Sequence, residues 1–161
     1  RKVKVADVQA KTHLLQRYGI QTGMFIMLGY DGEIVQDILD TVEHLKISNP
    51  DLFLTTVAYP IKGTPYYAEV ESRILAERDW EARSDRDLTV AGRYSRRFYR
   101  YATRYMVSSV ALHQANVNGG VSLPRKLKLA VSTAIGRAGM ALTAREREAS
   151  GQPVSAPAAG D

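Results

Sequence analysis

Apolar and polar positions change their spacing repeatedly along the first half of the chain. Residues 4–18 carry apolar side chains at helical spacing, and so do residues 33–46, where acidic residues occupy the opposite face. Residues 23–29 and 52–59 are short apolar runs, of the kind found in strands buried on both faces. The pattern predicts helix, strand, helix, strand, with the second helix crossing over between two parallel strands.

Two parallel strands do not form a stable sheet by themselves, because a parallel sheet needs neighbouring strands and cover on both faces. No clear strand pattern follows residue 59. The sequence opens at Arg1 without an initiator methionine and already at the front of a helix. We therefore expect the missing strands in polypeptide that precedes Arg1, so that the chain is the C-terminal part of a longer protein.

The second half of the chain has helical periodicity. Helices are predicted over residues 66–78, 92–116 and 124–147, and two glycines weaken the last of them. Residues 150–161 are rich in proline, alanine, glycine and serine, which predicts a disordered tail. A strand-containing part, a connector, a helical extension and a tail are expected at residues 1–78, 79–91, 92–148 and 149–161.

The absence of cysteine limits the chemistry that this chain can perform alone. Without thiols there are no disulfides, no thiolate zinc site and no iron–sulfur cluster ligated from within these 161 residues. The histidines lie far apart, and none has the spacing of paired metal ligands. No apolar stretch is long enough for a membrane span and no signal peptide opens the chain, so a cytoplasmic location is expected.

The formal charge of +5 is distributed unevenly, and two basic segments stand out. In residues 93–105 arginines run beside an aromatic stripe, which could bind nucleic acid but is more typical of a packed core with arginine stems around it. The aromatic members are Tyr94, Phe98, Tyr101 and Tyr105. Residues 125–147 form a basic helix that could lie on an anionic membrane. Its small residues, which offer little depth of insertion, are Ala130, Ala134, Ala138 and Ala141.

Glycine-containing turns follow directly after both predicted strands. Residues 29–33 read Gly-Tyr-Asp-Gly-Glu, and residues 59–66 read Tyr-Pro-Ile-Lys-Gly-Thr-Pro-Tyr. Ligands of parallel α/β sheets bind at the carboxyl ends of the strands, where both of these turns lie. Glycine lets the backbone approach a ligand closely, and backbone groups exposed at a strand end can contact an adenine. The two turns are therefore expected to form one ligand site.

These segments together resemble the radical S-adenosylmethionine (radical SAM) superfamily. The resemblance rests on an apolar strand ending in Gly-x-x-Gly-Glu at residues 23–33, an acidic helix ending in Asn-Pro-Asp at 49–51, and a strand closing on Pro-x-x-Gly-Thr-Pro-Tyr at 60–66. The similarity is greater to the subgroup with an N-terminal cobalamin-binding domain, which includes bacteriochlorophyll-cyclase-like enzymes and radical methyltransferases. It covers residues 1–75, and residues 92–115 resemble the variable C-terminal extension of that subgroup.

The resemblance implies an α/β fold, namely the C-terminal part of a parallel (β/α) partial TIM-type barrel followed by an α-helical extension. It also implies two groups of residues that bind S-adenosylmethionine. The first strand offers an apolar side chain to the adenine and a glycine for close approach, from among Ile26, Met27, Leu28 and Gly29. The end of the second strand offers backbone groups to the adenine, at Val57, Ala58 and Tyr59.

Two features of the sequence depart from the pattern of the family. Asp31 stands where the family usually has proline, and the CxxxCxxC motif is absent because cysteine is absent. Without that motif there is no [4Fe–4S] cluster and no electron to cleave S-adenosylmethionine. Glu33 matches a glutamate that starts a helix, and we interpret it as a favourable charge at the helix N-terminus rather than a catalytic acid.

The expected enzyme is therefore the longer parent polypeptide, and this segment alone is expected to be inactive. The parent would bind the [4Fe–4S] cluster, and cobalamin, through its upstream part, which is the expected partner of this chain. Its substrate would be a small molecule or a lipid-like compound. Two alternatives are a basic helical module that binds nucleic acid or an anionic membrane, and a noncatalytic barrel remnant. Nucleic-acid binding is disfavoured because it leaves the buried-type strands and the glycines at their ends unexplained.

Overall fold

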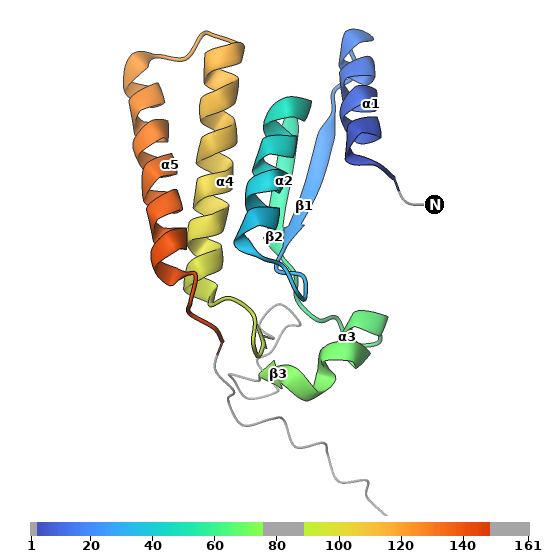
Figure 1. Cartoon of the computed structure of the whole chain (residues 1–161). Helices are drawn as coiled ribbons and strands as arrows, with labels where there is room; N and C mark the ends of the chain where they lie inside the picture. Colours follow the sequence, from blue (N-terminus) through green and yellow to red (C-terminus); the bar gives the residue numbers. More distant parts are fainter. Residues whose placement is uncertain (1–2, 76–88, 149–161) are drawn as a thin grey trace, which may run out of the picture.

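Residues 3–75 and 89–148 are described by the structure, a computed structural model. Their elements are α1 (Val5–Arg17), β1 (Gly23–Leu28), α2 (Val35–Ser48), β2 (Leu52–Val57), α3 (Pro65–Val70), the 3-10 helix η1 (Glu71–Arg73), β3 (Ile74–Leu75), β4 (Thr89–Val90), α4 (Arg96–Val117) and α5 (Leu123–Thr143). Figure 1 shows α2 between α1 on one side and the long α4–α5 hairpin on the other.

The first half has the predicted order, with α2 crossing over between two parallel strands. β1 and β2 pair in parallel from Gly23 opposite Leu52 to Leu28 opposite Val57. The Asp37 carboxylate accepts a hydrogen bond from the Ile34 N–H at 2.9 Å, which caps the start of α2. Near the start of the strands the side chain of Asp51 accepts hydrogen bonds from the backbone N–H and the hydroxyl of Thr22, at 2.7 and 3.0 Å. Short polar contacts thus hold both ends of the crossover helix.

Within the described residues the strands are covered on one face only, and the cover expected for the other face is assigned to further strands in preceding polypeptide. Met24, Ile26 and Leu28 point toward the core formed with α2 and α4. The opposite sheet face is apolar but exposed, with relative exposures of 63% for Phe25, 38% for Met27, 60% for Leu52 and 57% for Leu54. The helices cover one face, and no described segment covers these four residues, which we call the open sheet face.

The prediction of a helix over residues 66–78 is wrong at Ile74–Leu75, and residues 76–78 lie outside the described residues. The α-helix ends at Val70, and Ile74–Leu75 instead pairs antiparallel with Thr89–Val90. Ile74 and Val90 are paired across this short ladder and pack with Val70 in a small apolar cluster. This pair of two-residue strands forms a separate sheet and does not extend β1 and β2. The predicted connector falls largely on residues 76–88, which lie outside the described residues, as does the predicted tail.

The aromatic stripe of α4 belongs to the core. Phe98 is fully buried, the Tyr94 ring stacks on it at a centroid distance of 4.0 Å, and Tyr101 and Tyr105 pack at the edge of the same cluster. The stripe therefore leaves no row of free aromatic rings on which bases could stack.

The glycines of α5 lie at its closest approach to α4. A Cβ at Gly136 would lie 2.6 Å from the backbone nitrogen and 2.8 Å from the Cα of Tyr105, and a Cβ at Gly139 would overlap the Tyr101 ring. Rather than only weakening the helix, as the sequence suggested, these glycines allow the two helices to pack closely.

We predict that Gly136→Ala destabilises the protein, although alanine is the better helix former. The new methyl group meets the rigid backbone of α4, and overpacking of this kind costs about 1–3 kcal/mol. Urea denaturation of the variant measures the loss of unfolding free energy. Gly23→Ala is the matched control, because a Cβ there meets only the Leu52 carbonyl oxygen at 3.9 Å. Equal stability of the two variants would contradict the close packing of α4 and α5.

Candidate functional site

The carboxyl ends of β1 and β2 lie side by side, so the two glycine-containing turns begin at neighbouring points. The Ala58 N–H donates a hydrogen bond to the Leu28 carbonyl at 2.7 Å, which continues the parallel ladder past the end of the strands. Gly29 follows Leu28 directly, and Tyr59 and Pro60 follow Ala58. The pairing therefore brings the predicted residues of both turns to one edge of the sheet.

Arg93 joins this edge to the N-terminal end of α4. Its side chain is buried, with a relative exposure of 8% for the residue, and its Nη1 donates a hydrogen bond to the Ala58 carbonyl at 2.8 Å. Nε and Nη2 are also buried and have no hydrogen-bond partner among the described residues. The guanidinium carbon lies 5.4 Å from the centroid of the Tyr99 ring, within the range of a cation–π contact. Burying a guanidinium costs free energy when only one of its three nitrogens has a hydrogen-bond partner. Buried polar groups of this kind concentrate at functional sites.

Gly29 is required at its position for two reasons. Its φ of +83° lies in the left-handed region, where a side chain is strained. A Cβ would also overlap Nη2 of Arg93 and lie 3.1 Å from Cγ1 of Val57. The glycine therefore allows the close approach of the Arg93 side chain to the turn.

Glu33 and Tyr99 complete the polar surroundings of Arg93. Burial raises the pKa of the Glu33 carboxyl, and the Gly29 N–H, which donates to it at 2.9 Å, and the charge of Arg93 oppose this rise. Burial also raises the pKa of Tyr99 to about 12, against the opposing effect of Arg93. Tyr99 is therefore a neutral phenol at physiological pH and can act here as a hydrogen-bonding group, not as a base.

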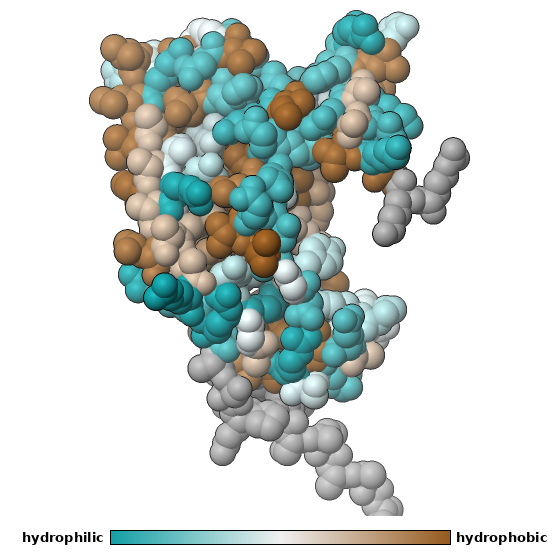
Figure 2. Space-filling view, in the orientation of Figure 1, coloured by the Kyte–Doolittle hydropathy of each residue, from teal (hydrophilic) through white to brown (hydrophobic). Residues whose placement is uncertain are grey.

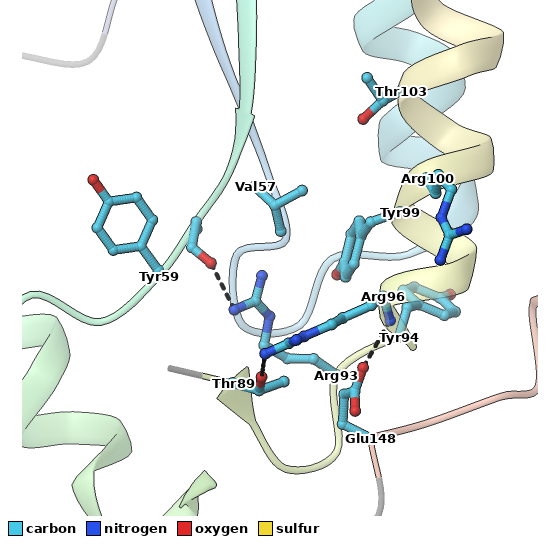
Figure 3. A pocket seen from close by; sticks show the side chains of 11 residues that line it. Val57, Tyr59, Thr89, Arg93, Tyr94, Arg96, Tyr99, Arg100, Thr103 and Glu148 are labelled. Atoms are coloured by element: carbon cyan, nitrogen blue, oxygen red, sulfur yellow. Dashed lines mark hydrogen bonds between the residues drawn. The ribbon is translucent and has the colours of Figure 1, made fainter. Parts of the chain in front are cut away.

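A cleft of about 410 Å³ opens between the end of β2 and the first turns of α4. Figure 3 shows arginine and tyrosine side chains converging on it from the chain before α4 and from α4 itself. Arg96 donates to the Thr89 hydroxyl at 2.8 Å, and its backbone N–H donates to the Glu148 carboxylate at 2.7 Å. The lining residues are Val57, Ala58, Tyr59, Thr89, Arg93, Tyr94, Arg96, Tyr99, Arg100, Thr103 and Glu148.

A second hollow, of about 240 Å³, lies at the turn after β1. Its lining includes Asp31 and Glu33 from that turn and Arg147 from the segment after α5. Arg93, Tyr94 and Tyr99 line both hollows, so they separate the two spaces. Asp31 also forms a two-point ion pair with Arg73, at 3.1 Å for each contact, which ties the turn to η1.

The residues predicted to bind a ligand fall into three environments. Val57, Ala58 and Tyr59 line the larger cleft together. Met27 belongs to the open sheet face, whereas Ile26 and Leu28 pack into the core with the helices. Of the three apolar side chains proposed for the first strand, only Met27 is placed where a ligand on the open sheet face could reach it.

Arg93 and Tyr99 were not identified as site residues from the sequence. Arg93 begins a series of four arginines in which the others, Arg97, Arg100 and Arg104, are exposed. Periodicity does not distinguish the buried member, because its burial depends on the carbonyl of Ala58, distant in the sequence. The isolated pairing of Tyr94 with Arg147, next to this arginine, is likewise invisible in local patterns.

The described residues do not offer a metal site. Residues 3–75 and 89–148 contain no group of three histidine, cysteine, aspartate or glutamate side chains placed to hold a metal ion. The whole sequence lacks cysteine. A [4Fe–4S] cluster therefore does not fit this chain by itself.

Comparison with known proteins leaves the family of this chain open. No protein-family model, no curated protein and no solved structure matches it.

We predict that Glu33→Gln changes how stability depends on pH. The pKa of Glu33 is raised in the folded state, so the folded state holds this proton more tightly than the unfolded state does. The contribution of Glu33 to the unfolding free energy is most favourable below the unfolded pKa of about 4.3 and declines as pH rises through the folded-state pKa. Glutamine keeps an acceptor for the Gly29 N–H but does not ionise.

Denaturation of both proteins at a series of pH values tests this. The stability of the Gln variant relative to the wild type should increase as pH rises above about 4.3. Glu69→Gln, at an exposed position of α3, is the matched control and should leave the pH profile nearly unchanged. A profile for Glu33→Gln that runs parallel to the wild type would show that Glu33 is not perturbed in the folded state.

Proposed function

We propose that this chain is the C-terminal part of the catalytic barrel of a radical SAM enzyme, and that its strand ends help to bind S-adenosylmethionine. The observation that carries the proposal is the hydrogen bond between the Ala58 N–H and the Leu28 carbonyl, at 2.7 Å. It places the two turns that carry the family resemblance at the same edge of a parallel strand pair, which is where such folds bind ligands.

The candidate contacts for S-adenosylmethionine come from both strands. Met27, on the open sheet face, would pack against the adenine, and backbone groups at Val57 and Tyr59 would border it at the end of β2. The Val57 side chain packs with Leu28 on the helix-covered face, so only the backbone of Val57 is available on the side of Met27. Ala58 contributes less than the resemblance implies, because its N–H donates to Leu28 and its carbonyl already accepts from Arg93. That carbonyl keeps one further lone pair for a ligand.

The open sheet face supports a larger sheet than the described residues form. Phe25, Met27, Leu52 and Leu54 expose a contiguous apolar surface next to two unpaired strand edges. Parallel strands are normally covered on both faces and flanked by further strands. Strands contributed by another part of the polypeptide would cover this surface and continue the sheet into a partial barrel.

The cluster has to be held outside this chain, because no residue type that ligates it through sulfur is present. When bound, it supplies the electron that cleaves S-adenosylmethionine. The proposed contribution of the present residues is therefore to bind and orient: Met27 and the end of β2 would hold the nucleoside, and Arg93 would fix the backbone at Ala58. Cobalamin would be bound by an upstream domain, and the substrate would be a small molecule or a lipid-like compound.

The test uses the polypeptide encoded by the whole reading frame that contains this chain. We expect that this protein, reconstituted with iron and sulfide without oxygen and supplied with a reductant, converts S-adenosylmethionine to 5′-deoxyadenosine, detected by mass spectrometry. Met27→Asp should weaken binding of S-adenosylmethionine about tenfold or more, because it places a carboxylate against the adenine.

Leu15→Asp is the matched control, because Leu15 is 43% exposed and lies near the end of α1, which leads into the start of β1 rather than the strand ends. It should bind S-adenosylmethionine like the wild type, and both variants should retain the absorption of the cluster. A reconstituted protein that holds a cluster but forms no 5′-deoxyadenosine would overturn the proposed activity. Equal affinities of the two variants would overturn the role of Met27.

A further inference from the structure

One face of α5 is apolar and exposed along most of the helix. Its opposite face packs on α4 through Gly136, Gly139 and Met140. At about 100° per residue, the exposed apolar side chains fall within an arc of about 120° that points away from α4. We call them the outer stripe of α5: Leu123, Leu127, Val131, Ile135 and Leu142, with relative exposures of 79%, 64%, 51%, 42% and 83%. Figure 2 shows hydrophobic side chains gathered along this edge of the molecule.

The charges of α5 have a single sign. Every ionisable residue from Leu123 to Thr143 is a lysine or an arginine. By the same helical geometry Lys128 borders the outer stripe on one side, and Lys126 and Arg137 border it on the other. Long basic side chains at the two borders of an apolar face can extend toward lipid phosphates while that face inserts.

We propose that the outer stripe of α5 binds the surface of an anionic phospholipid bilayer, with the helix lying parallel to the membrane plane. None of the helices within residues 3–75 and 89–148 has the length and hydropathy needed to cross a bilayer, so contact with one leaflet is the arrangement that fits. A protein partner is less suited to this face, because lysine is depleted in protein interfaces. The five large side chains also supply an insertion depth that the alanines of this helix would not.

Sedimentation of the full chain with lipid vesicles tests the proposal. We expect binding to vesicles of phosphatidylcholine mixed with phosphatidylglycerol, and much weaker binding to phosphatidylcholine alone. Leu123→Ser, Leu127→Ser and Leu142→Ser combined should reduce binding about tenfold or more, because these side chains would insert. All three are exposed, so the core is unaltered, and circular dichroism verifies the helix content.

Val5→Ser combined with Ile20→Ser is the matched control for loss of exposed apolar surface. Val5 lies on α1 and Ile20 shortly after it, and their exposures of 59% and 51% are similar to that of Val131. This variant should bind anionic vesicles like the wild type. If it loses binding to the same extent as the α5 variant, adsorption is a general effect of exposed apolar residues and the proposal fails.

Removal of charge provides a second measurement. Lys128→Gln combined with Arg137→Gln should lower affinity for anionic vesicles about fivefold for each charge removed. Lys11→Gln combined with Arg17→Gln, on the exposed surface of α1, changes the net charge equally and should have a smaller effect.

Two results would overturn the membrane proposal. One is equal sedimentation of the wild type with neutral and with anionic vesicles, or equal sedimentation of the wild type and the α5 serine variant with anionic vesicles. The other is that light scattering detects a dimer, that the serine substitutions in α5 dissociate it, and that no vesicle binding is seen. The outer stripe would then be an interface between two copies of the chain. Neither measurement requires S-adenosylmethionine or a cluster, so the outcome is independent of the proposed enzyme activity.

Discussion

The parallel pairing of β1 with β2 is the interaction on which the rest of the structure depends. It requires a crossover helix, and α2 in turn provides the apolar surface on which α4 packs through Ile38, Val42 and Leu45. The same pairing extends to the hydrogen bond between Ala58 and Leu28, which aligns the turns after the two strands. A pair of strands with one covered face is incomplete as a parallel sheet, and the open sheet face is the direct consequence.

Arg93 links this strand pair to the helical hairpin. It inserts against Gly29 and donates to the Ala58 carbonyl, so the position of α4 relative to the end of β2 is set by a buried, charged hydrogen bond. The segment after α5 returns to the same place, where Glu148 donates its N–H to the Arg93 carbonyl at 2.9 Å and Arg147 covers the Tyr94 ring. The helical extension is thus part of the wall of the larger cleft rather than an appendage.

Local patterns were sufficient to predict α1 to β2. The two helices repeat apolar residues at helical spacing, and the two strands are short apolar runs bounded by turn residues. Periodicity failed at residues 74–75, where a segment with helical spacing forms a short strand that packs in a tertiary cluster. Periodicity also did not show which of Ile26, Met27 and Leu28 face the core. The covered face of β1 depends on α2 and α4, which come later in the sequence. The burial of Arg93 among exposed arginines depends on a contact with Ala58, which no local pattern encodes.

We propose that the strand pair is completed by polypeptide that also holds an iron–sulfur cluster. Determining the coding sequence upstream of Arg1 in the genome tests it most directly. We expect an open frame that continues in phase, encodes parallel strands with a CxxxCxxC motif, and begins with a cobalamin-type α/β domain. A stop codon followed by a start site immediately before Arg1 would contradict the claim and leave the strand pair without a cluster.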